Sequence, residues 1–206
     1  MNILVDLLPT SVNIDAKKYE INSDFRTSIL FELLIQDSSI DYKNKIYMAL
    51  NLYYPVIPKN INEAIENILW LYKCGKDTAT SKGNVQGNVQ GNVKGKGVSQ
   101  IYSFEHDDDY IYAAFIHQYN IDLQDIEYLH WWKFKAMFKS LKEDNMIVKI
   151  MKYRSMDLSK IKEKEQKSYY KKMKELYKIP IHQDEQEKLD EITNALLNGD
   201  DLSKIL

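Results

Sequence analysis

The pattern of apolar and polar residues changes its period near residue 23. Before that point, apolar and polar positions alternate on either side of a polar stretch at residues 15–18. Alternation with a period of two is typical of a β-strand, because successive side chains point to opposite faces of the strand. The apolar positions that alternate in this way are Val12, Ile14, Tyr19 and Ile21. The start of the chain is therefore expected to form a short β-hairpin.

After residue 23, apolar residues recur three and four positions apart, which is the spacing of one face of an α-helix. Aspartate, asparagine or serine precedes most of these runs, where its side chain can accept hydrogen bonds from the first amides of a helix. The predicted helices cover residues 25–35, 42–53, 63–72, 110–119, 123–141, 144–154, 160–178 and 185–197. The expected fold class is mostly α: a compact multi-helix domain with a small N-terminal β-hairpin.

A glycine- and asparagine-rich stretch interrupts the helical pattern. Residues 83–97 read GNVQGNVQGNVKGKG, a four-residue repeat that is too short a unit for a solenoid. It also lacks the following helix and the Lys-Ser/Thr pair of a phosphate-binding loop. High glycine content lowers burial and raises chain entropy, so we predict a long disordered loop over about residues 76–99. The expected organisation is one helical domain over residues 1–180, followed by an acidic C-terminal helix and tail over residues 181–206.

The composition is that of a globular chain, with 44% hydrophobic and 28% charged residues over 206 positions. The net charge of −2 gives no overall attraction to nucleic acid or to an anionic membrane. A single cysteine, Cys74, excludes an intrachain disulfide and a cysteine-rich metal site. No stretch approaches the ~20 apolar residues of a membrane span, and the first residues lack the pattern of a signal peptide, so we expect a cytoplasmic protein.

The residues that carry chemistry do not converge on a catalytic or metal motif. The four histidines, at positions 106, 117, 130 and 182, lack the i, i+4 spacing of a helical zinc site. Three acids at 107–109 stand at a predicted helix start. The simpler interpretation is that they cap the helix, and the more specific alternative is that they bind a divalent cation. A nucleophilic Cys74 would need a base that the sequence does not place. We therefore predict no catalytic, cofactor or metal site.

Two stretches rich in aromatic residues are candidates for binding. Residues 128–138 lack the ligands and glycines of a haem or flavin pocket, so a buried helix face explains them more simply. Trp131 and Trp132 are adjacent and cannot share one helix face, so at least one must meet a second packing surface, in this chain or in a partner. The second stretch is lysine-rich and includes Tyr169 and Tyr170. Such a stretch can bind nucleic acid, although the interspersed acids favour a solvated helix.

Charge is segregated toward the end of the chain. Residues 157–178 hold eight lysines and four acids, a net charge of +4. Residues 182–206 hold seven acids and two lysines, a net charge of −5. The two segments could fold against each other, or each could bind a partner of opposite charge.

Four stretches together resemble a bacteriophage family catalogued as gene product fifteen, found in tailed phages and prophages of Gram-positive bacteria. In chain order they are WLYKCGK at 70–76, IYSFEHDDDYIYAAFIHQYNIDL at 101–123, LHWWKFKAMFKSL at 129–141 and YRSMDLSKIKEKEQKSYYKKMKELYKIP at 153–180. The similarity runs from the N-terminal hairpin to Pro180 and is strongest after residue 100. The GNVQ repeat and the segment after Pro180 depart from the family pattern.

The resemblance implies a tail assembly chaperone, because genes of this family typically lie between those of the major tail protein and the tape measure protein. Its expected partners are the tape measure protein and, as a second partner, the major tail protein, in the host bacterial cytoplasm. The role is non-catalytic, and self-association is compatible with it. The leading alternative is a structural tail or head–tail connector subunit retained in the virion. A nucleic-acid-binding protein ranks third and an enzyme fourth.

A chaperone of this kind needs exposed apolar and aromatic anchors that dock amphipathic helices, surrounded by a polar rim. We expect some members of one aromatic set to line that surface and the rest to form core: Tyr112, Phe115, Trp131, Trp132, Phe134 and Phe138. The candidate partner-binding residues are Tyr112, Phe115, Trp131, Trp132, Phe134, Phe138, Tyr169 and Tyr170.

Overall fold

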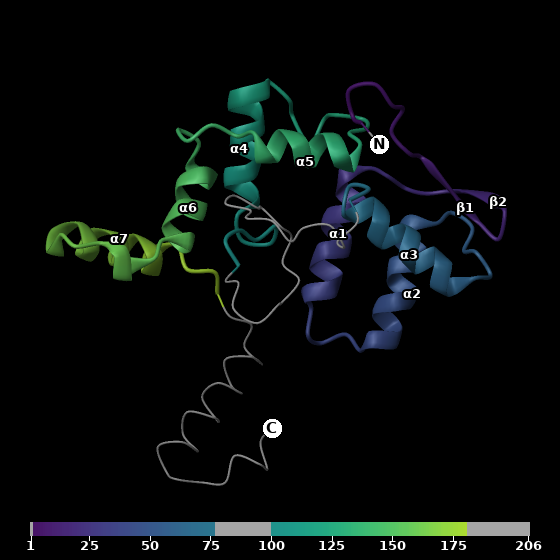
Figure 1. The fold of residues 1–206 in the computed structure, drawn as a ribbon, viewed down its shortest axis with the longest axis horizontal. Coiled ribbons are helices and arrows are strands. Elements are labelled where there is room, and N and C mark those ends of the chain that lie inside the picture. The colour runs from purple at the N-terminus through teal and green to yellow at the C-terminus, as the bar shows by residue number, and fades with distance from the viewer. Residues whose placement is uncertain (1, 77–99, 181–206) are drawn as a thin grey trace, which may run out of the picture. The chain divides into compact units, whose positions relative to one another are not determined.

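The computed structural model describes residues 2–76 and 100–180 (Figure 1). The chain divides into two compact units, Met1–Met156 and Asp157–Leu206. The loop predicted over residues 76–99 and the helix predicted over 185–197 lie outside the described residues, apart from residue 76, and the domain boundary predicted at residue 180 stays a prediction.

The first unit opens with the predicted β-hairpin. Strands β1 (Ser11–Ile14) and β2 (Lys17–Glu20) pair antiparallel, with Ser11 opposite Glu20 and Ile14 opposite Lys17. The turn is shorter than the predicted polar stretch, because it consists of Asp15 and Ala16 alone, both with positive φ (48° and 58°). Two central residues with positive φ match the right-handed twist of the strands that they join.

Three helices follow, each starting at a side chain that caps its free amides. Helix α1 spans Phe25–Gln36, α2 spans Tyr42–Tyr53 and α3 spans Ile61–Tyr72. Asp24, Asp41 and Asn60 accept hydrogen bonds from backbone amides of the first turn of α1, α2 and α3, respectively. These caps are local in sequence, which is why the periodic pattern predicts all three helices closely.

The remaining regular elements of the described chain are also helices, which confirms the mostly α fold class. Helices α4 (Asp108–Tyr119), α5 (Trp131–Lys139) and α6 (Met146–Ser155) complete the first unit. In the second unit, a single 3₁₀ turn (Leu158–Lys160) precedes α7 (Lys164–Leu176), so the helix predicted from residue 160 begins later than expected.

The helix predicted over residues 123–141 is wrong in its first half, because α5 begins only at Trp131. The residues before it are held against the start of α1 by backbone hydrogen bonds. The Phe25 amide donates to the Leu129 carbonyl (2.9 Å), and the Trp131 amide donates to the Ser23 carbonyl (2.8 Å). His130 lies between them in an isolated antiparallel bridge with Asp24. Its Nδ1 accepts the Trp132 amide and caps α5.

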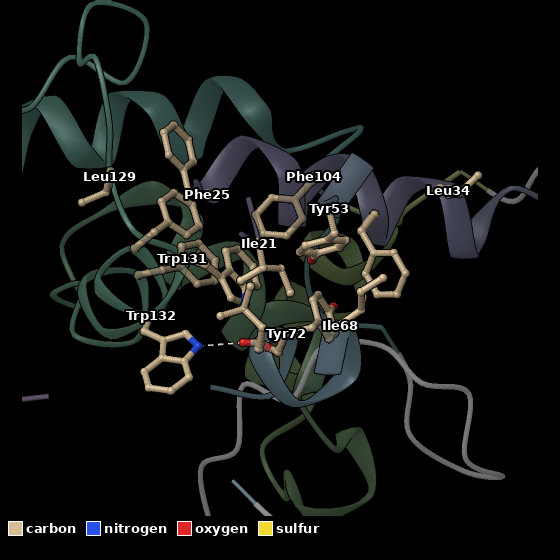
Figure 2. Packing of buried hydrophobic residues seen from close by; sticks show 14 of the residues in the cluster. Ile21, Phe25, Leu34, Tyr53, Ile68, Tyr72, Phe104, Leu129, Trp131 and Trp132 are labelled. Carbon is tan, nitrogen blue, oxygen red and sulfur yellow. Dashed lines mark hydrogen bonds between the residues drawn. The ribbon is translucent and has the colours of Figure 1, made fainter. Parts of the chain in front are cut away.

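The core of the first unit is built around α5, which contacts both α1 and α4 (Figure 1). Phe134 is at its centre and is fully buried. Its ring stacks on Phe25 of α1 at 5.0 Å between centroids and on Phe115 of α4 at 4.9 Å. It also stacks on Trp131 at 5.7 Å. Figure 2 shows Phe25 and Trp131 of this cluster together with buried side chains of α2 and α3, namely Tyr53, Ile68 and Tyr72.

Candidate functional site

Five of the eight candidate partner-binding residues lie in the core rather than on a surface. Each of them is at most 5% exposed, so none can contact a partner while the first unit is folded. The five are Phe115, Trp131, Trp132, Phe134 and Phe138. Of the two expected positions, docking surface or core, these five residues occupy the core.

Tyr112, the sixth candidate of the first unit, is half-buried on α4. Its hydroxyl donates a hydrogen bond to Asp122 Oδ2 at 2.9 Å, and this contact raises the pKa of Tyr112. The bond joins α4 to the segment that precedes α5. A role for Tyr112 in binding a partner stays a prediction.

The two adjacent tryptophans both bind the C-terminal end of α3. Trp131 Nε1 donates to the Tyr72 carbonyl at 2.8 Å, and Trp132 Nε1 donates to the Leu71 carbonyl at 2.7 Å; Figure 2 shows Trp132 and its bond. The last carbonyls of a helix lack intrahelical donors, so the indole of Trp131 gives the Tyr72 carbonyl a strong donor. The Leu71 carbonyl accepts the Cys74 amide at 3.0 Å as well as the indole of Trp132. The second packing surface that the sequence required is thus α3, in this chain.

The end of α3 is shaped to receive Trp132. Cys74 and Gly75 both have positive φ, 58° and 67°. A Cβ built on Gly75 would lie 2.8 Å from Cη2 of Trp132, closer than real Cβ contacts allow. Burial raises the pKa of the Cys74 thiol, which disfavours the thiolate that a nucleophile requires. The geometry therefore gives Cys74 a place in a turn and gives no support to a nucleophilic role.

A buried carboxylate, Glu32 of α1, is the most unusual titratable group in the first unit. It is 1% exposed, and the Tyr72 hydroxyl donates to its Oε2 at 2.5 Å. Burial raises the pKa of Glu32 above its ordinary value of 4.5, although the hydrogen bond from Tyr72 opposes this shift. Lys135 of α5 also opposes the rise in the pKa of Glu32, and burial lowers the pKa of Lys135 itself.

Lys135 is held among aromatic groups beside this carboxylate. Its Nζ lies 3.4 Å from the Tyr102 hydroxyl and 5.1 Å from the centre of the Trp131 ring, where it makes a cation–π contact. Among the described residues, every buried side-chain nitrogen and oxygen has a hydrogen-bond partner. Glu32 and Lys135 thus each bind groups of the first unit, Glu32 through Tyr72 and Lys135 through Tyr102 and Trp131, and these contacts are those of a structural network.

Of the three acids at the start of α4, Asp108 and Asp109 lie in its first turn as expected, whereas Asp107 has a different role from capping. Asp107 occupies the N-cap position but makes no side-chain capping bond. Its buried carboxylate instead binds Arg154 of α6 in two places, Oδ2 to Nη1 at 2.5 Å and Oδ1 to Nη2 at 2.9 Å. The Ser103 amide also donates to Oδ2 at 2.8 Å. Within residues 2–76 and 100–180, no three histidine, cysteine or acidic side chains gather closely enough to hold a metal ion.

The described histidines also have structural contacts or exposed positions. His130 Nε2 is 3.1 Å from the Pro9 carbonyl, and burial lowers the pKa of this histidine. His106 is 3.9 Å from the exposed Glu105 carboxylate, and His117 lies in the last turn of α4. His182 lies outside the described residues.

The remaining two candidates, Tyr169 and Tyr170, lie on α7, where no residue is buried. At about 100° per residue, the large apolar side chains of this segment fall within an arc of about 120°. We call this arc the α7 stripe: Tyr169, Tyr170, Met173, Leu176 and Tyr177. Tyr169 is 51% and Leu176 65% exposed. The rest of α7 carries five lysines and two glutamates, so the stripe has a predominantly basic border.

The α7 stripe has the form of a docking face. An amphipathic helix presents anchors at i, i+3, i+4 and i+7 to a groove or to another helix. Positions 169, 173 and 176 and positions 170, 173 and 177 have this spacing. Its tyrosines are amphipathic, and Tyr169 and Tyr170 contact each other edge to face at 5.4 Å. The sequence named two members of this stripe and missed Met173, Leu176 and Tyr177, although their helical spacing is visible in it.

Comparison with known proteins places the chain in a family. None of the described helices is both long and apolar enough to cross a membrane. No curated protein and no solved structure matches the chain. A family model described as Bacteriophage Gp15 protein matches residues 4–179, which include the hairpin and α1 to α7. Because this match covers most of the 206 residues and confirms the resemblance, the chain belongs to the bacteriophage Gp15 protein family.

Proposed function

We propose that this phage protein is a tail assembly chaperone that acts in the host cytoplasm by binding, without catalysis. Its client would be the tape measure protein, whose long amphipathic helices must stay soluble before the tail is built, and the major tail protein would be a second partner. The observation that carries the proposal is the α7 stripe, in which Tyr169 and Leu176 are exposed and the other three side chains are half-buried. Family membership supports the phage context, and the resemblance supplies the expected client.

The stripe suits a helical client better than a small ligand. Its anchors follow one side of a 13-residue helix, about 20 Å long, and an amphipathic client helix can lie along them. Burying a side chain as large as Leu176 contributes about 1.5–3 kcal/mol. The lysines beside the stripe would attract a client with acidic flanks and would keep the free chaperone soluble.

Co-expression with the tape measure protein tests the proposal. The client should be soluble and co-purify with the wild-type chain. Leu176→Glu should lower the co-purified amount at least tenfold, because it replaces an apolar anchor with a charge. Ser168→Glu is the matched control, since it adds the same charge to an exposed position on the same helix outside the stripe. A client that is equally soluble and uncomplexed with and without this chain would rule out the chaperone.

Two further measurements separate the chaperone from a structural subunit and from a nucleic-acid-binding protein. A structural subunit would be found by mass spectrometry in purified virions, whereas an assembly factor would be absent from them. The lysines and adjacent tyrosines of α7 also favour a test for nucleic-acid binding. A gel shift that weakens steeply with salt and is lost in Tyr169→Ala would support that third function in place of the chaperone.

A further inference from the structure

The α7 stripe has a candidate occupant within the same chain. Helix α7 carries a net charge of +3, from five lysines and two glutamates. Residues 181–206, which follow it, hold seven acids and two lysines. This acidic segment also lies outside the family match, which ends at residue 179. We propose that the acidic segment 181–206 docks on the α7 stripe in the free chain and competes there with the client; the competition rests on the proposed function, whereas the docking does not.

The apolar pattern of the acidic segment matches the stripe. Leu189, Ile192 and Leu196 recur three and four positions apart, so the sequence predicts an amphipathic helix over residues 185–197. That predicted helix has 13 residues, the same number as α7, and each would be about 20 Å long. Two amphipathic helices of equal length can bury their apolar sides along each other over their full extent.

The chain between the two helices is long enough for an antiparallel return. Eight residues, 177–184, separate Leu176 from residue 185. Helix–helix connections in bundles commonly have two to eight residues, so this length fits a helical hairpin. Pro180 lies within the connection, where it interrupts neither helix.

Opposite charge and covalent attachment make this segment a better occupant than an unrelated protein. Attachment through a short linker gives an effective concentration in the millimolar range, so even weak docking would be populated. The lysines that border the stripe would face acids of the segment, and a contact between exposed charges weakens as salt screens it. A client would then have to displace the segment, and the stripe would stay covered until a sufficiently tight binding partner arrived.

Hydrogen–deuterium exchange of the full chain tests the docking without a client. Ile192→Glu places a charge in the apolar side of the segment and should raise the exchange rates of α7 amides at least tenfold. Asn194→Glu is the matched control, since it adds the same charge to the same segment off that apolar side and should leave exchange unchanged. Raising the salt concentration to about 1 M should shift the wild type toward the Ile192→Glu pattern.

A synthetic peptide of residues 181–206 supplies a second measurement. The labelled peptide should bind the Ile192→Glu chain at least tenfold more tightly than the wild type, whose own segment occupies the stripe, and a scrambled peptide should bind neither. Equal α7 exchange in the wild type and both variants would overturn the docking, as would protection that depends on protein concentration, which assigns the stripe to a second copy. If docking holds but Ile192→Glu captures no more tape measure protein on co-expression, the competition is overturned.

Discussion

Replacing Gly75 with alanine tests whether the end of α3 is shaped by Trp132. Gly75 has φ +67°, a conformation that costs an L-residue about 1–2 kcal/mol. Its new Cβ would lie 2.8 Å from Trp132 Cη2 and 3.2 Å from Cζ2. The indole cannot move away freely, because it is 5% exposed and its Nε1 is bound to the Leu71 carbonyl. Overpacking of this kind costs about 1–3 kcal/mol.

The expected loss is large compared with the stability of a domain. Alanine also restricts the unfolded chain, which stabilises the folded state by about 0.4–1 kcal/mol. The net decrease in the free energy of unfolding of Gly75→Ala is therefore about 3 kcal/mol. Most domains are stable by about 5–15 kcal/mol, so this change should lower the midpoint of urea unfolding markedly. Tryptophan fluorescence of the full chain measures it, since Trp131 and Trp132 are both buried in the first unit.

Two further variants separate strain from collision. Cys74→Gly changes the adjacent residue, which also has positive φ. Its free energy of unfolding should stay within about 1 kcal/mol of the wild-type value, because the change relieves left-handed strain while it removes a small side chain. Trp132→Phe removes the indole atoms that the Cβ added by Gly75→Ala would strike, so the double variant should recover at least about 1 kcal/mol of the loss. Two results would refute the collision. One is a free energy of unfolding of Gly75→Ala within about 0.5 kcal/mol of the wild-type value. The other is an equal loss of stability when Gly75→Ala is made in the Trp132→Phe background.

Two more predictions concern buried charges. Asp107→Asn should destabilise the chain by about 3–5 kcal/mol because it removes the carboxylate charge that pairs with the buried Arg154. Asp107→Leu combined with Arg154→Met should recover most of this loss. Thermal unfolding measures both variants, and equal losses would contradict the pairing. Burial raises the pKa of Glu32, so the folded state holds this proton more tightly than the unfolded state. Its contribution to stability is therefore greatest below pH 4.5, the ordinary pKa, and falls as the pH rises through the folded pKa. Urea unfolding from about pH 4 to about pH 8 should show a weaker decline in Glu32→Gln than in the wild type, and parallel profiles would exclude Glu32 as the cause.

Local chemistry made the first half of the fold predictable. Asp24, Asp41 and Asn60 each cap the helix that begins immediately after them, so position in sequence is enough to locate α1, α2 and α3. The start of α5 could not be found in this way. It depends on the bond between the Trp131 amide and the Ser23 carbonyl, groups more than a hundred residues apart, and no periodic pattern contains that information.

The same distinction explains why the sequence left some residues between two interpretations. A buried aromatic cluster and an exposed aromatic anchor have the same composition, so Phe115 and Phe134 could be assigned to either. Asp107 was interpreted as a cap because it stands at a predicted helix start, whereas its partner, Arg154, is 47 residues away. The prediction from adjacency is confirmed: at least one of Trp131 and Trp132 was expected to meet a second packing surface, and both reach α3.

Variants on α5 and on α7 therefore have to be interpreted differently. The aromatic side chains of α5 hold the first unit together, so a variant such as Phe134→Ala that loses a partner reports unfolding as readily as loss of contact. Leu176 of the α7 stripe is 65% exposed, so a change there removes little buried area from the folded chain. Lost binding with an unchanged unfolding midpoint can therefore come from α7 and cannot come from the α5 core. That combination is the evidence that would assign a client to the α7 stripe.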